Sequence, residues 1–458
     1  MKKVNLLQKT HFIHFIGIGG VSMSALAKLA HNKGFVVSGS DLCSNNITKQ
    51  LKALNIKVYK GHKISNIKHP DLVVYTAAVG QDNCELVYAK SLNIKCIDRA
   101  TFLAQISNMY DNVIAVAGMH GKTTTTAMLS KVFICCNKNP TVHIGGEWQD
   151  IGGNVLIGGS EYFITEACEY KDSFLKLTPS VSIVTNIERE HLDYFKNIGN
   201  IKKSFNRFCQ STQNQVFLSH KYKANVICSN LTTFGVDGDI KAVNIKHKAG
   251  KYSCDCYINN SFYGKIILNI YGQHNLLNAL AVVGVANYYN LPKDKVLQAL
   301  SDFNNVGRRF EQVSTINSAP VIIDYAHHPT EIKCAIKTCK EVFKKPIVVV
   351  FQPHTYSRTK TLIKSFSKCF NGVDSLILVN TYSARESYDK FGDCNALKEH
   401  ILTQNPKFKV FNPVNKTGLI GQIKAQDLTG KVVLALGAGD VVNVFKPKNN
   451  PQKTKKLP

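Results

Sequence analysis

The chain lacks long apolar runs and paired cysteine motifs. Its longest apolar runs, such as IVVVF at Ile347–Phe351, are far shorter than the about 20 residues that a membrane-spanning helix needs. None of the fourteen cysteines forms a CxxC pair, so neither a zinc site nor a disulfide framework is indicated. These absences predict a protein without membrane insertion that works in the reducing cytoplasm.

Acidic residues are also scarce. The chain has 31 Asp and Glu against 57 Lys and Arg, a formal net charge of +26, which is a usual sign of nucleic-acid binding. Here 50 of the basic residues are lysines, spread along the chain among many Asn and Ile residues, as A/T-rich codons would produce. We therefore expect no nucleic-acid partner, which stays a minor alternative, and a positive field that favours small anionic substrates.

Strand and helix patterns alternate along the chain in three series. At 458 residues the chain exceeds the size of one hydrophobic core. The first series runs to about residue 98, the second opens at residue 111, and the third starts near residue 307. Such alternation predicts an α/β fold of three units with mainly parallel sheets. Residues 214–270 are expected to carry shorter strands.

A shortened phosphate-loop motif, GMHGKTTTT, begins at Gly118. The usual motif is two residues longer, and Val116 stands where its first glycine belongs. The glycines let the backbone approach phosphate oxygens, Lys122 supplies a positive charge, and Thr123 offers a hydroxyl to Mg²⁺. Because a predicted strand precedes the loop and a predicted helix follows it, the motif favours ATP binding over a simple glycine turn.

A second glycine turn, GIGGVS, joins the first predicted strand to a helix. Backbone N–H groups at such a helix start can hold a diphosphate, with Gly17, Gly19 and Gly20 in the turn. Ser22 stands where a dinucleotide-binding fingerprint has glycine, and Asp41 ends the next strand, where a ribose-binding carboxylate belongs. This degenerate pattern leaves open a nucleotide-diphosphate site, a nicotinamide-dependent dehydrogenase and a structural turn.

Further polar residues follow predicted strands. EACEYKDSF and TNIEREHLDYF place Glu166, Glu169 and His191 where they can converge on the phosphate loop, and carboxylates with an imidazole suit a cation. DYAHHPTE places His327 and His328 in a turn before a helix. Since these adjacent histidines lack a third spaced ligand, a nucleotide-facing loop or helix capping is favoured over a metal pair.

Two motifs of the third series, FQPHTYSRT and TYSARE, also lie just after strands, where open α/β sheets bind ligands. Their polar residues are His354, Arg358, Tyr382 and Arg385. Two arginines out of only seven in the chain indicate recognition of a carboxylate.

Taken in order, nine motifs between about residues 11 and 444 resemble the Mur ligase superfamily of peptidoglycan synthesis. They are FIGIGG, GMHGKTTTT, EACEY, TNIEREHLDYF, GQHNLLNALA, GRRFE, DYAHHPTEI, FQPHTYSRT and GAGD. The histidine in the phosphate loop and DYAHHPTEI are most similar to the branch that adds L-alanine. The resemblance implies a UDP-sugar-binding Rossmann-like domain at 1–108, a central P-loop ATPase domain at 109–307, an amino-acid-binding Rossmann-like domain at 308–446 and a disordered basic tail at 447–458.

The resemblance also implies an activity. In that branch ATP phosphorylates the lactyl carboxylate of UDP-N-acetylmuramate, and the amine of L-alanine attacks the acyl phosphate, which is the first peptide step of peptidoglycan precursor synthesis. ATP and Mg²⁺ are the implied cofactors, and both a monomer and a dimer fit. A recycling ligase that joins a tripeptide to the same nucleotide sugar is the nearest alternative, and a binding module with a decayed site is a remote one.

Residue by residue, the resemblance implies a set of site residues. The implied catalytic residues are Lys122, Glu169 and His191. The implied metal ligands are Thr123, Glu169 and His191. The implied ATP-binding residues are Gly118, His120, Gly121, Lys122, Thr123, Thr124, Asn275, Asn278, Arg309 and Asp324. The implied substrate-binding residues are Gly17, Gly19, Gly20, Ser22, His354, Arg358, Tyr382 and Arg385. Thr355 and Cys168 depart from the family pattern, which usually has arginine and often has aspartate there.

Overall fold

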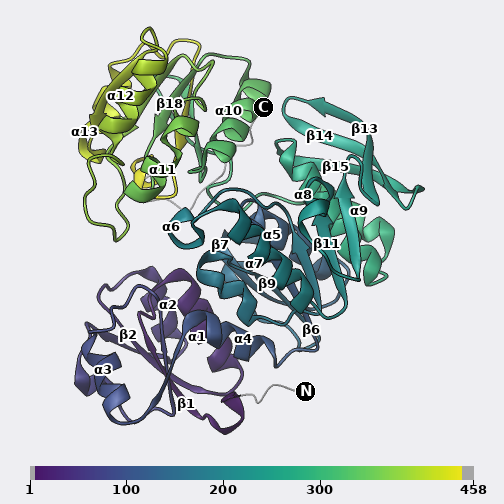
Figure 1. Ribbon diagram of the computed structural model, residues 1–458, viewed down its shortest axis with the longest axis vertical. Helices are drawn as coiled ribbons and strands as arrows, with labels where there is room; N and C mark the ends of the chain where they lie inside the picture. The colour runs from purple at the N-terminus through teal and green to yellow at the C-terminus, as the bar shows by residue number, and fades with distance from the viewer. Residues whose placement is uncertain (1–5, 446–458) are drawn as a thin grey trace.

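The computed structural model describes residues 6–445, so the expected disordered tail at 447–458 lies outside the described residues. Figure 1 shows three α/β units in chain order, with the first in purple, the second in teal and the third in green to yellow. The expected alternation of strands and helices around mainly parallel sheets is confirmed. Within the described part, every helix is too short or too polar to cross a membrane.

The first unit holds a five-stranded parallel sheet in the order β3-β2-β1-β4-β5. Its strands are β1 (Phe12–Ile16), β2 (Val36–Asp41), β3 (Lys57–Lys60), β4 (Leu72–Tyr75) and β5 (Lys95–Asp98). Its helices are α1 (Val21–Asn32), α2 (Asn46–Ala53), α3 (Cys84–Ser91) and α4 (Arg99–Ser107). Because β1 lies in the centre of the sheet, the glycine turn that follows it opens at the carboxyl edge, beside the place where the strand order reverses.

The central unit holds a ten-stranded sheet in the order β15-β14-β13-β12-β11-β10-β6-β9-β7-β8. Its strands are β6 (Asn112–Ala117), β7 (Thr141–Trp148), β8 (Gly153–Leu156), β9 (Tyr162–Glu166), β10 (Val181–Val184), β11 (Gln215–Ser219), β12 (Leu231–Gly235), β13 (Ile240–Lys248), β14 (Lys251–Ile258) and β15 (Ser261–Tyr271). Its helices are α5 (Lys122–Cys135), α6 (Leu192–Phe195), α7 (Ile198–Ser211), α8 (His274–Tyr288) and α9 (Lys293–Ser301). Strands β9, β6 and β10 run parallel side by side, so the loops after them meet at one edge.

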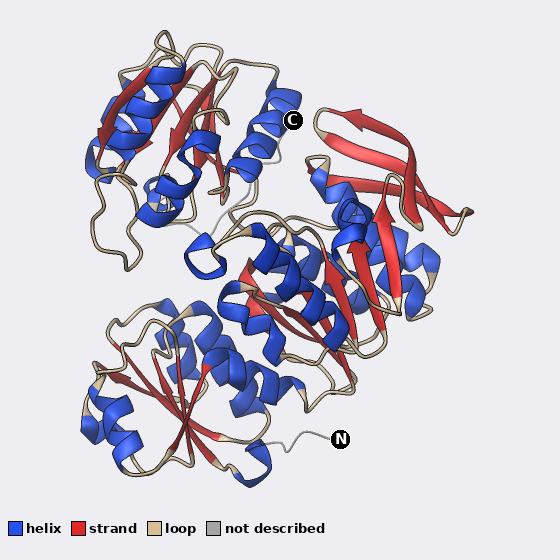
Figure 2. Ribbon diagram, in the orientation of Figure 1, coloured by secondary structure: helices blue, strands red, loops and turns tan. Residues whose placement is uncertain are grey.

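The expectation of shorter strands over residues 214–270 is wrong for β13, β14 and β15, which have 9, 8 and 11 residues. They pair antiparallel and extend the sheet beyond its parallel part, as the red arrows in Figure 2 show. In β14 and β15 buried and more exposed residues largely alternate, because one face packs while the other faces solvent. Polar residues at every second position made these strands look interrupted in the sequence.

The third unit holds a six-stranded sheet in the order β16-β17-β21-β18-β19-β20. Its strands are β16 (Glu311–Ile316), β17 (Ala319–Asp324), β18 (Ile347–Phe351), β19 (Ser375–Val379), β20 (Val410–Val414) and β21 (Val432–Leu436). Its helices are α10 (Pro329–Phe343), α11 (Tyr356–Phe366), α12 (Cys394–Gln404) and α13 (Lys416–Lys424). All pairings are parallel except that of β16 with β17. All five residues of β18 are buried, as expected for a parallel strand covered on both faces.

The three units are joined in two different ways. One apolar cluster runs from the first unit into the central unit and includes Phe15, Phe102, Phe163 and Phe205. The clusters of the third unit contain no buried residue from the other two units. Contacts of the third unit with the central unit include ion pairs such as Arg358 with Glu190. Because such polar contacts resemble a transient interface, the third unit is the one suited to move.

Candidate active site

The phosphate loop lies between β6 and α5, at the carboxyl edge of the central sheet. Gly118 and Gly121 have φ angles of 135° and 83°, which favour glycine. Two side chains after β10 brace the loop: the Thr185 hydroxyl and the Asn186 amide donate to the His120 carbonyl at 2.7 and 2.8 Å. The first N–H groups of α5 therefore point to a fixed place that suits a phosphate group.

Lys122, Glu169 and His191 meet beside this loop, although they come from three separate segments. Lys122 Nζ lies 2.9 Å from Glu169 Oε2, and His191 Nε2 lies 3.3 Å from Glu169 Oε1. Burial alone would raise the pKa of Glu169, but the charges of Lys122 and His191 outweigh it and lower that pKa. The buried carboxylate is therefore ionised at neutral pH and sits next to the charge of Lys122.

Glu166 lies at the end of β9, on the same side of the phosphate loop. Its Oε1 accepts a hydrogen bond from the Gly145 amide at 2.6 Å, and the Thr123 side chain faces it. Burial raises its pKa, and it forms no ion pair with any described residue. The expected convergence of Glu166, Glu169 and His191 on the loop is seen in the structure.

These donors are chemically suited to a hard cation. A threonine hydroxyl and a carboxylate offer oxygen ligands, which Mg²⁺ prefers, and His191 adds an imidazole. Glu166, a half-buried carboxylate that forms no ion pair with a described residue, would also be stabilised by a nearby cation. Thr123, Glu169 and His191 thus fit the metal-ligand role that we predict for them.

A cavity of about 260 Å³ opens from the loop toward the third unit. Seven of the predicted ATP-binding residues line it, namely His120, Gly121, Thr124, Asn275, Asn278, Arg309 and Asp324. Asn278 donates to Asn275 Oδ1 at 3.0 Å, so the two amides from α8 are held in one orientation. The backbone of Phe310 donates to Asp324 at 2.8 Å, which fixes the carboxylate at the far wall. A nucleotide in this cavity would touch both units.

The glycine turn after β1 is held by Asp41, the last residue of the neighbouring strand β2. The Gly19 amide donates to Asp41 Oδ2 at 2.9 Å, and the Cys43 amide donates to Asp41 Oδ1 at 3.0 Å. Asp41, which the sequence placed as a ribose-binding carboxylate, therefore fixes the turn. Gly17 has a φ of 81° that favours glycine.

Ser22 and neighbouring side chains connect the glycine turn to the central unit. Arg99 Nη1 donates to Ser22 Oγ at 3.0 Å, and His143 Nε2 lies 3.3 Å from the same oxygen. Burial and the nearby Arg99 charge lower the pKa of His143 to about 3, so this imidazole is neutral. Asn154 donates to the Val21 carbonyl at 2.7 Å. The start of α1 is thus tied to β7 and β8 of the central unit.

A second cavity, of about 410 Å³, lies between the loop after β10 and the start of α11. Two of the four predicted substrate-binding residues of the third unit, His354 and Arg358, line it. Tyr382 lies outside its lining and stacks on His354 with ring centroids 5.5 Å apart. Arg385 is exposed and also lies outside the lining. The role of each of these four residues stays a prediction.

Arg358 is already engaged. Its Nε lies 2.8 Å from Glu190 Oε1, and its Nη1 lies 2.8 Å from His354 Nδ1. Burial and the Arg358 charge lower the pKa of His354 to about 3. Thr355, the departure from the family pattern, has a φ of 67° and caps α11. A positive φ is strained for a β-branched residue, and such strain tends to occur at functional sites.

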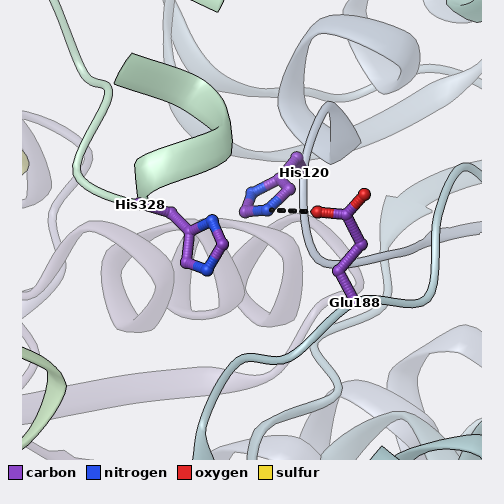
Figure 3. Close-up of side chains that lie close together, drawn as sticks. All are labelled: His120, Glu188 and His328. Atoms are coloured by element: carbon purple, nitrogen blue, oxygen red, sulfur yellow. Dashed lines mark ion pairs between the residues drawn. The ribbon is translucent and has the colours of Figure 1, made fainter. Parts of the chain in front are cut away.

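The ligand atoms of His120, Glu188 and His328 lie within 4.8 Å of one another. Figure 3 shows the three side chains close together, with the ion pair between His120 and Glu188. The sequence around His328 contains no further metal ligand at a suitable spacing, but in the fold His120 and Glu188 lie next to it. However, His328 Nδ1 accepts from the Thr330 amide at 3.3 Å, and its Nε2 lies 3.1 Å from the Arg189 carbonyl. Both ring nitrogens of His328 thus have partners, and the group joins the central unit to the third unit. The predicted helix-capping role of His328 is confirmed at α10.

His120 also pairs with Glu331 of α10, with Nδ1 and Oε1 3.0 Å apart. Burial opposes a charge on His120, but Glu331, Glu190 and Glu188 outweigh it and raise its pKa. Because its pKa is raised in the folded state, protonated His120 stabilises the folded protein. This contribution to stability is complete below the ordinary histidine pKa of 6.5 and is lost as the pH rises through the raised pKa of His120. The attachment of the third unit is therefore weaker in alkali.

We expect Glu331→Gln to flatten this pH dependence. Glutamine keeps an oxygen acceptor for the backbone N–H groups of His327 and His328, so the cap of α10 persists. The variant should lose about 1 kcal/mol of unfolding free energy near pH 6 and less near pH 9. Urea unfolding across this range measures the difference. An equal loss at both pH values would assign the effect to helix capping alone.

Some residues of this site were not selected from the sequence. Glu188, Glu190 and Glu331 stood inside recognised motifs, yet their partners come from distant segments, so spacing could not reveal the ion pairs. Arg99 carried no motif at all. The available signal for Glu188 and Glu190 was their place just after a buried strand, where ligand-binding loops of parallel sheets lie.

Three family models match consecutive parts of the chain. The model described as Mur ligase family, catalytic domain, matches residues 12–111. The model described as Mur ligase middle domain matches residues 116–286. The model described as Mur ligase, glutamate ligase domain, matches residues 308–439. Together the matches extend through all three units.

Similarity to individual proteins covers nearly the whole chain. A UDP-N-acetylmuramate–L-alanine ligase from Clostridium novyi (strain NT) is 42% identical over 443 residues, which cover 94% of this chain and 96% of that protein. The ligase of the same name from Clostridium perfringens (strain 13 / Type A) is 42% identical over 447 residues, with the same coverage. A solved structure, the UDP-N-acetylmuramate-alanine ligase from Thermotoga maritima, aligns with a TM-score of 0.79 at 29% identity, covering 94% of this chain and 97% of that one.

Proposed function

The chain belongs to the Mur ligase family, and we propose that it uses ATP to join L-alanine to the lactyl carboxylate of UDP-N-acetylmuramate. This is the first peptide step of peptidoglycan precursor synthesis. The proposal rests on 42% identity along nearly the full chain to ligases of that name. The contacts among Lys122, Glu169 and His191 beside the phosphate loop support it, because they supply the charges that phosphoryl transfer needs.

We assign the work to three parts of the chain. Residues 1–108 would bind the UDP-sugar, with its diphosphate at the glycine turn that Asp41 holds. Residues 109–307 would bind ATP at the phosphate loop. Residues 308–446 would close over the nucleotide through Arg309 and Asp324 and bring the amino acid. The polar contacts of the third unit suit such closure, which excludes water from a reactive acyl phosphate.

The chemistry follows from the charges at the loop. Lys122 would stabilise the phosphoryl group as it moves to the lactyl carboxylate, and the amine of L-alanine would then displace phosphate to form the amide. Mg²⁺, held by Thr123, Glu169 and His191, would supply further neutralisation of phosphate charge. Asn275 would face the adenine, where the cavity is walled by α8.

We place this reaction in the cytoplasm. All fourteen cysteines lie in the described part of the chain, and all are free thiols. Free thiols at this number are typical of a reducing compartment. ATP and a UDP-linked sugar are available in that compartment.

The direct test is phosphate release by purified protein with UDP-N-acetylmuramate, ATP and Mg²⁺. We expect release only when L-alanine is added, because without an amine the acyl phosphate has no acceptor in a closed site. A malachite-green assay measures the phosphate, and mass spectrometry measures the UDP-sugar product. Release that does not depend on L-alanine would contradict the proposal.

The same assay separates the alternatives. A tripeptide that competes better than L-alanine would favour the recycling ligase. Binding of NADH, followed by its fluorescence, would revive the dehydrogenase interpretation of the glycine turn. Glycine and L-serine, offered at equal concentration, would measure how strictly the site selects a methyl side chain.

A further inference from the structure

The 410 Å³ cavity between the loop after β10 and the start of α11 is called here the inter-unit cavity. The acidic and basic residues that line it differ in how they are paired. Three carboxylates line it, and each has a partner. Glu190 pairs with Arg358 at 2.8 Å, Asp193 accepts from the Tyr170 hydroxyl at 2.9 Å, and Glu386 accepts from the backbone of Ser357 at 2.8 Å. Each acid of the lining is thus held by a neighbouring residue, although Glu190 Oε2 accepts no hydrogen bond from a described residue.

The cations of the lining are Arg358, Lys196 and Arg189. Arg358 is neutralised by Glu190, and the Lys196 ammonium donates to the Asp193 carbonyl at 2.6 Å. The Arg189 guanidinium makes no hydrogen bond or ion pair with any other residue between 6 and 445. Its charge and its five N–H donors therefore remain available to a ligand.

The backbone of Arg189 is nevertheless well fixed. Its carbonyl lies 3.1 Å from His328 Nε2, and the residues on both sides contact the third unit. Glu188 accepts from the Thr330 hydroxyl at 3.0 Å, and Glu190 pairs with Arg358. The Arg189 side chain is exposed and lines the inter-unit cavity, while its backbone is fixed by these contacts.

We propose that Arg189 binds the carboxylate of the incoming amino acid. This inference rests on the proposed function, which requires an amino acid whose amine reaches the phosphoryl end of the site. His191 lines the inter-unit cavity and contacts Glu169, so the cavity adjoins the Lys122 group. A guanidinium binds a carboxylate through two parallel hydrogen bonds, which orients the molecule as well as holding it. Arg189 thereby directs the amine toward the site of phosphoryl transfer.

The two arginines selected from the sequence are less suited to this task. Arg358 would have to leave Glu190, and a buried carboxylate would then stay uncompensated. Arg385 is exposed outside the lining of the inter-unit cavity. Arg189 lines the cavity and would break no ion pair when it binds a carboxylate, because its guanidinium has no other partner among the described residues.

The test is Arg189→Gln in the full-length enzyme, with steady-state kinetics for each substrate. We expect the KM for L-alanine to rise about 10- to 100-fold, the range for losing hydrogen bonds to a charged group. The kcat and the KM for ATP should change by less than about threefold, since Arg189 does not touch the reacting phosphate. Arg189→Lys should recover part of the affinity, because it keeps the charge without the paired donors.

L-alaninamide, which has the amine but no carboxylate, provides a second readout. Wild type should use L-alanine far better than L-alaninamide, and Arg189→Gln should lose most of that preference. A merely structural effect would lower the use of both amines alike. Arg207→Gln, which removes an exposed arginine on α7 away from the inter-unit cavity, serves as the matched control and should change neither value.

Three results would overturn the inference: an unchanged KM for L-alanine in Arg189→Gln, an equal loss for both amines, or a larger effect from Lys196→Gln or Arg385→Gln. Failure of the proposed function gives a different result. In that case wild type itself would show no alanine-dependent phosphate release, whatever the variant does.

Discussion

Lys122→Ala is expected to lower kcat by about a thousandfold or more, because the lysine charge opposes the negative charge of the moving phosphoryl group in a site shielded from water. In the structure Lys122 Nζ lies 2.9 Å from Glu169 and also donates to the Gly118 carbonyl at 2.5 Å. Removing it takes away a phosphate contact and leaves a buried carboxylate without its main counter-charge. Rapid-quench measurement of ADP formation would report the loss directly.

Binding of the UDP-sugar should survive this substitution. The glycine turn after β1 is held by Asp41, and neither its hydrogen bonds nor those of Ser22 involve Lys122. Calorimetry should therefore give a Kd for UDP-N-acetylmuramate within about threefold of wild type. Equal loss of rate and of UDP-sugar binding would show that the units do not divide the work as proposed.

A matched control lies on the same helix. Lys131, also on α5, pairs with Asp150 at 2.9 Å near the surface, away from the phosphate loop. Lys131→Ala removes the same charge from the same helix but breaks only a partly exposed ion pair, which contributes at most about 1 kcal/mol. Its kcat should stay near that of wild type. A comparable loss in both variants would point to helix destabilisation instead of catalysis.

The sequence predicted the parallel parts of the fold well, for a physical reason. Strands such as β18 are buried on both faces, so they appear as unbroken apolar runs between helices of period 3.6. The antiparallel strands β13 to β15 face solvent on one side, and their polar residues hid their length. A sequence pattern reports burial, and strands that are half exposed give a weaker pattern.

The sequence predicted the parts of the site that are formed by residues close together in the chain. The glycines of the phosphate loop and Lys122 follow from a strand, a turn and a helix that are adjacent in sequence. The pairing of Glu190 with Arg358 joins residues 168 positions apart, and no spacing rule contains it. The sequence also could not show that the Arg189 guanidinium has no partner among the described residues, because this depends on which residues surround it in the fold.

The full-length similarity and the local geometry support each other at the phosphate loop. The loop is two residues shorter than the common motif, and the structure shows what fixes the short form. Thr185 and Asn186, both following β10, hold the His120 carbonyl, while the His120 side chain reaches Glu331 of the third unit. The loop is thus braced from the central sheet and contacted by the third unit.

Gly118→Ala is the second substitution with a large expected effect. A Cβ at this position would lie 2.0 Å from Thr185 Oγ1 and 3.1 Å from the Asn186 amide, and the backbone φ of 135° is rarely adopted by other residues. Thr185 cannot simply turn away, since its hydroxyl holds the His120 carbonyl. The loop must therefore shift, and with it the N–H groups and the lysine that contact phosphate.

A shift of even about 1 Å in a positioned group can cost about a hundredfold in rate, so kcat should fall at least that far. Stability should also fall by about 2 to 4 kcal/mol, from steric overlap and backbone strain together. Gly34→Ala separates these causes, because Gly34 has a φ of 89° but its Cβ would meet nothing within 4 Å. That variant should lose about 1 kcal/mol and keep full activity. Similar rates for the two variants would mean that the short loop tolerates displacement, and that bracing by Thr185 is not what positions the phosphate.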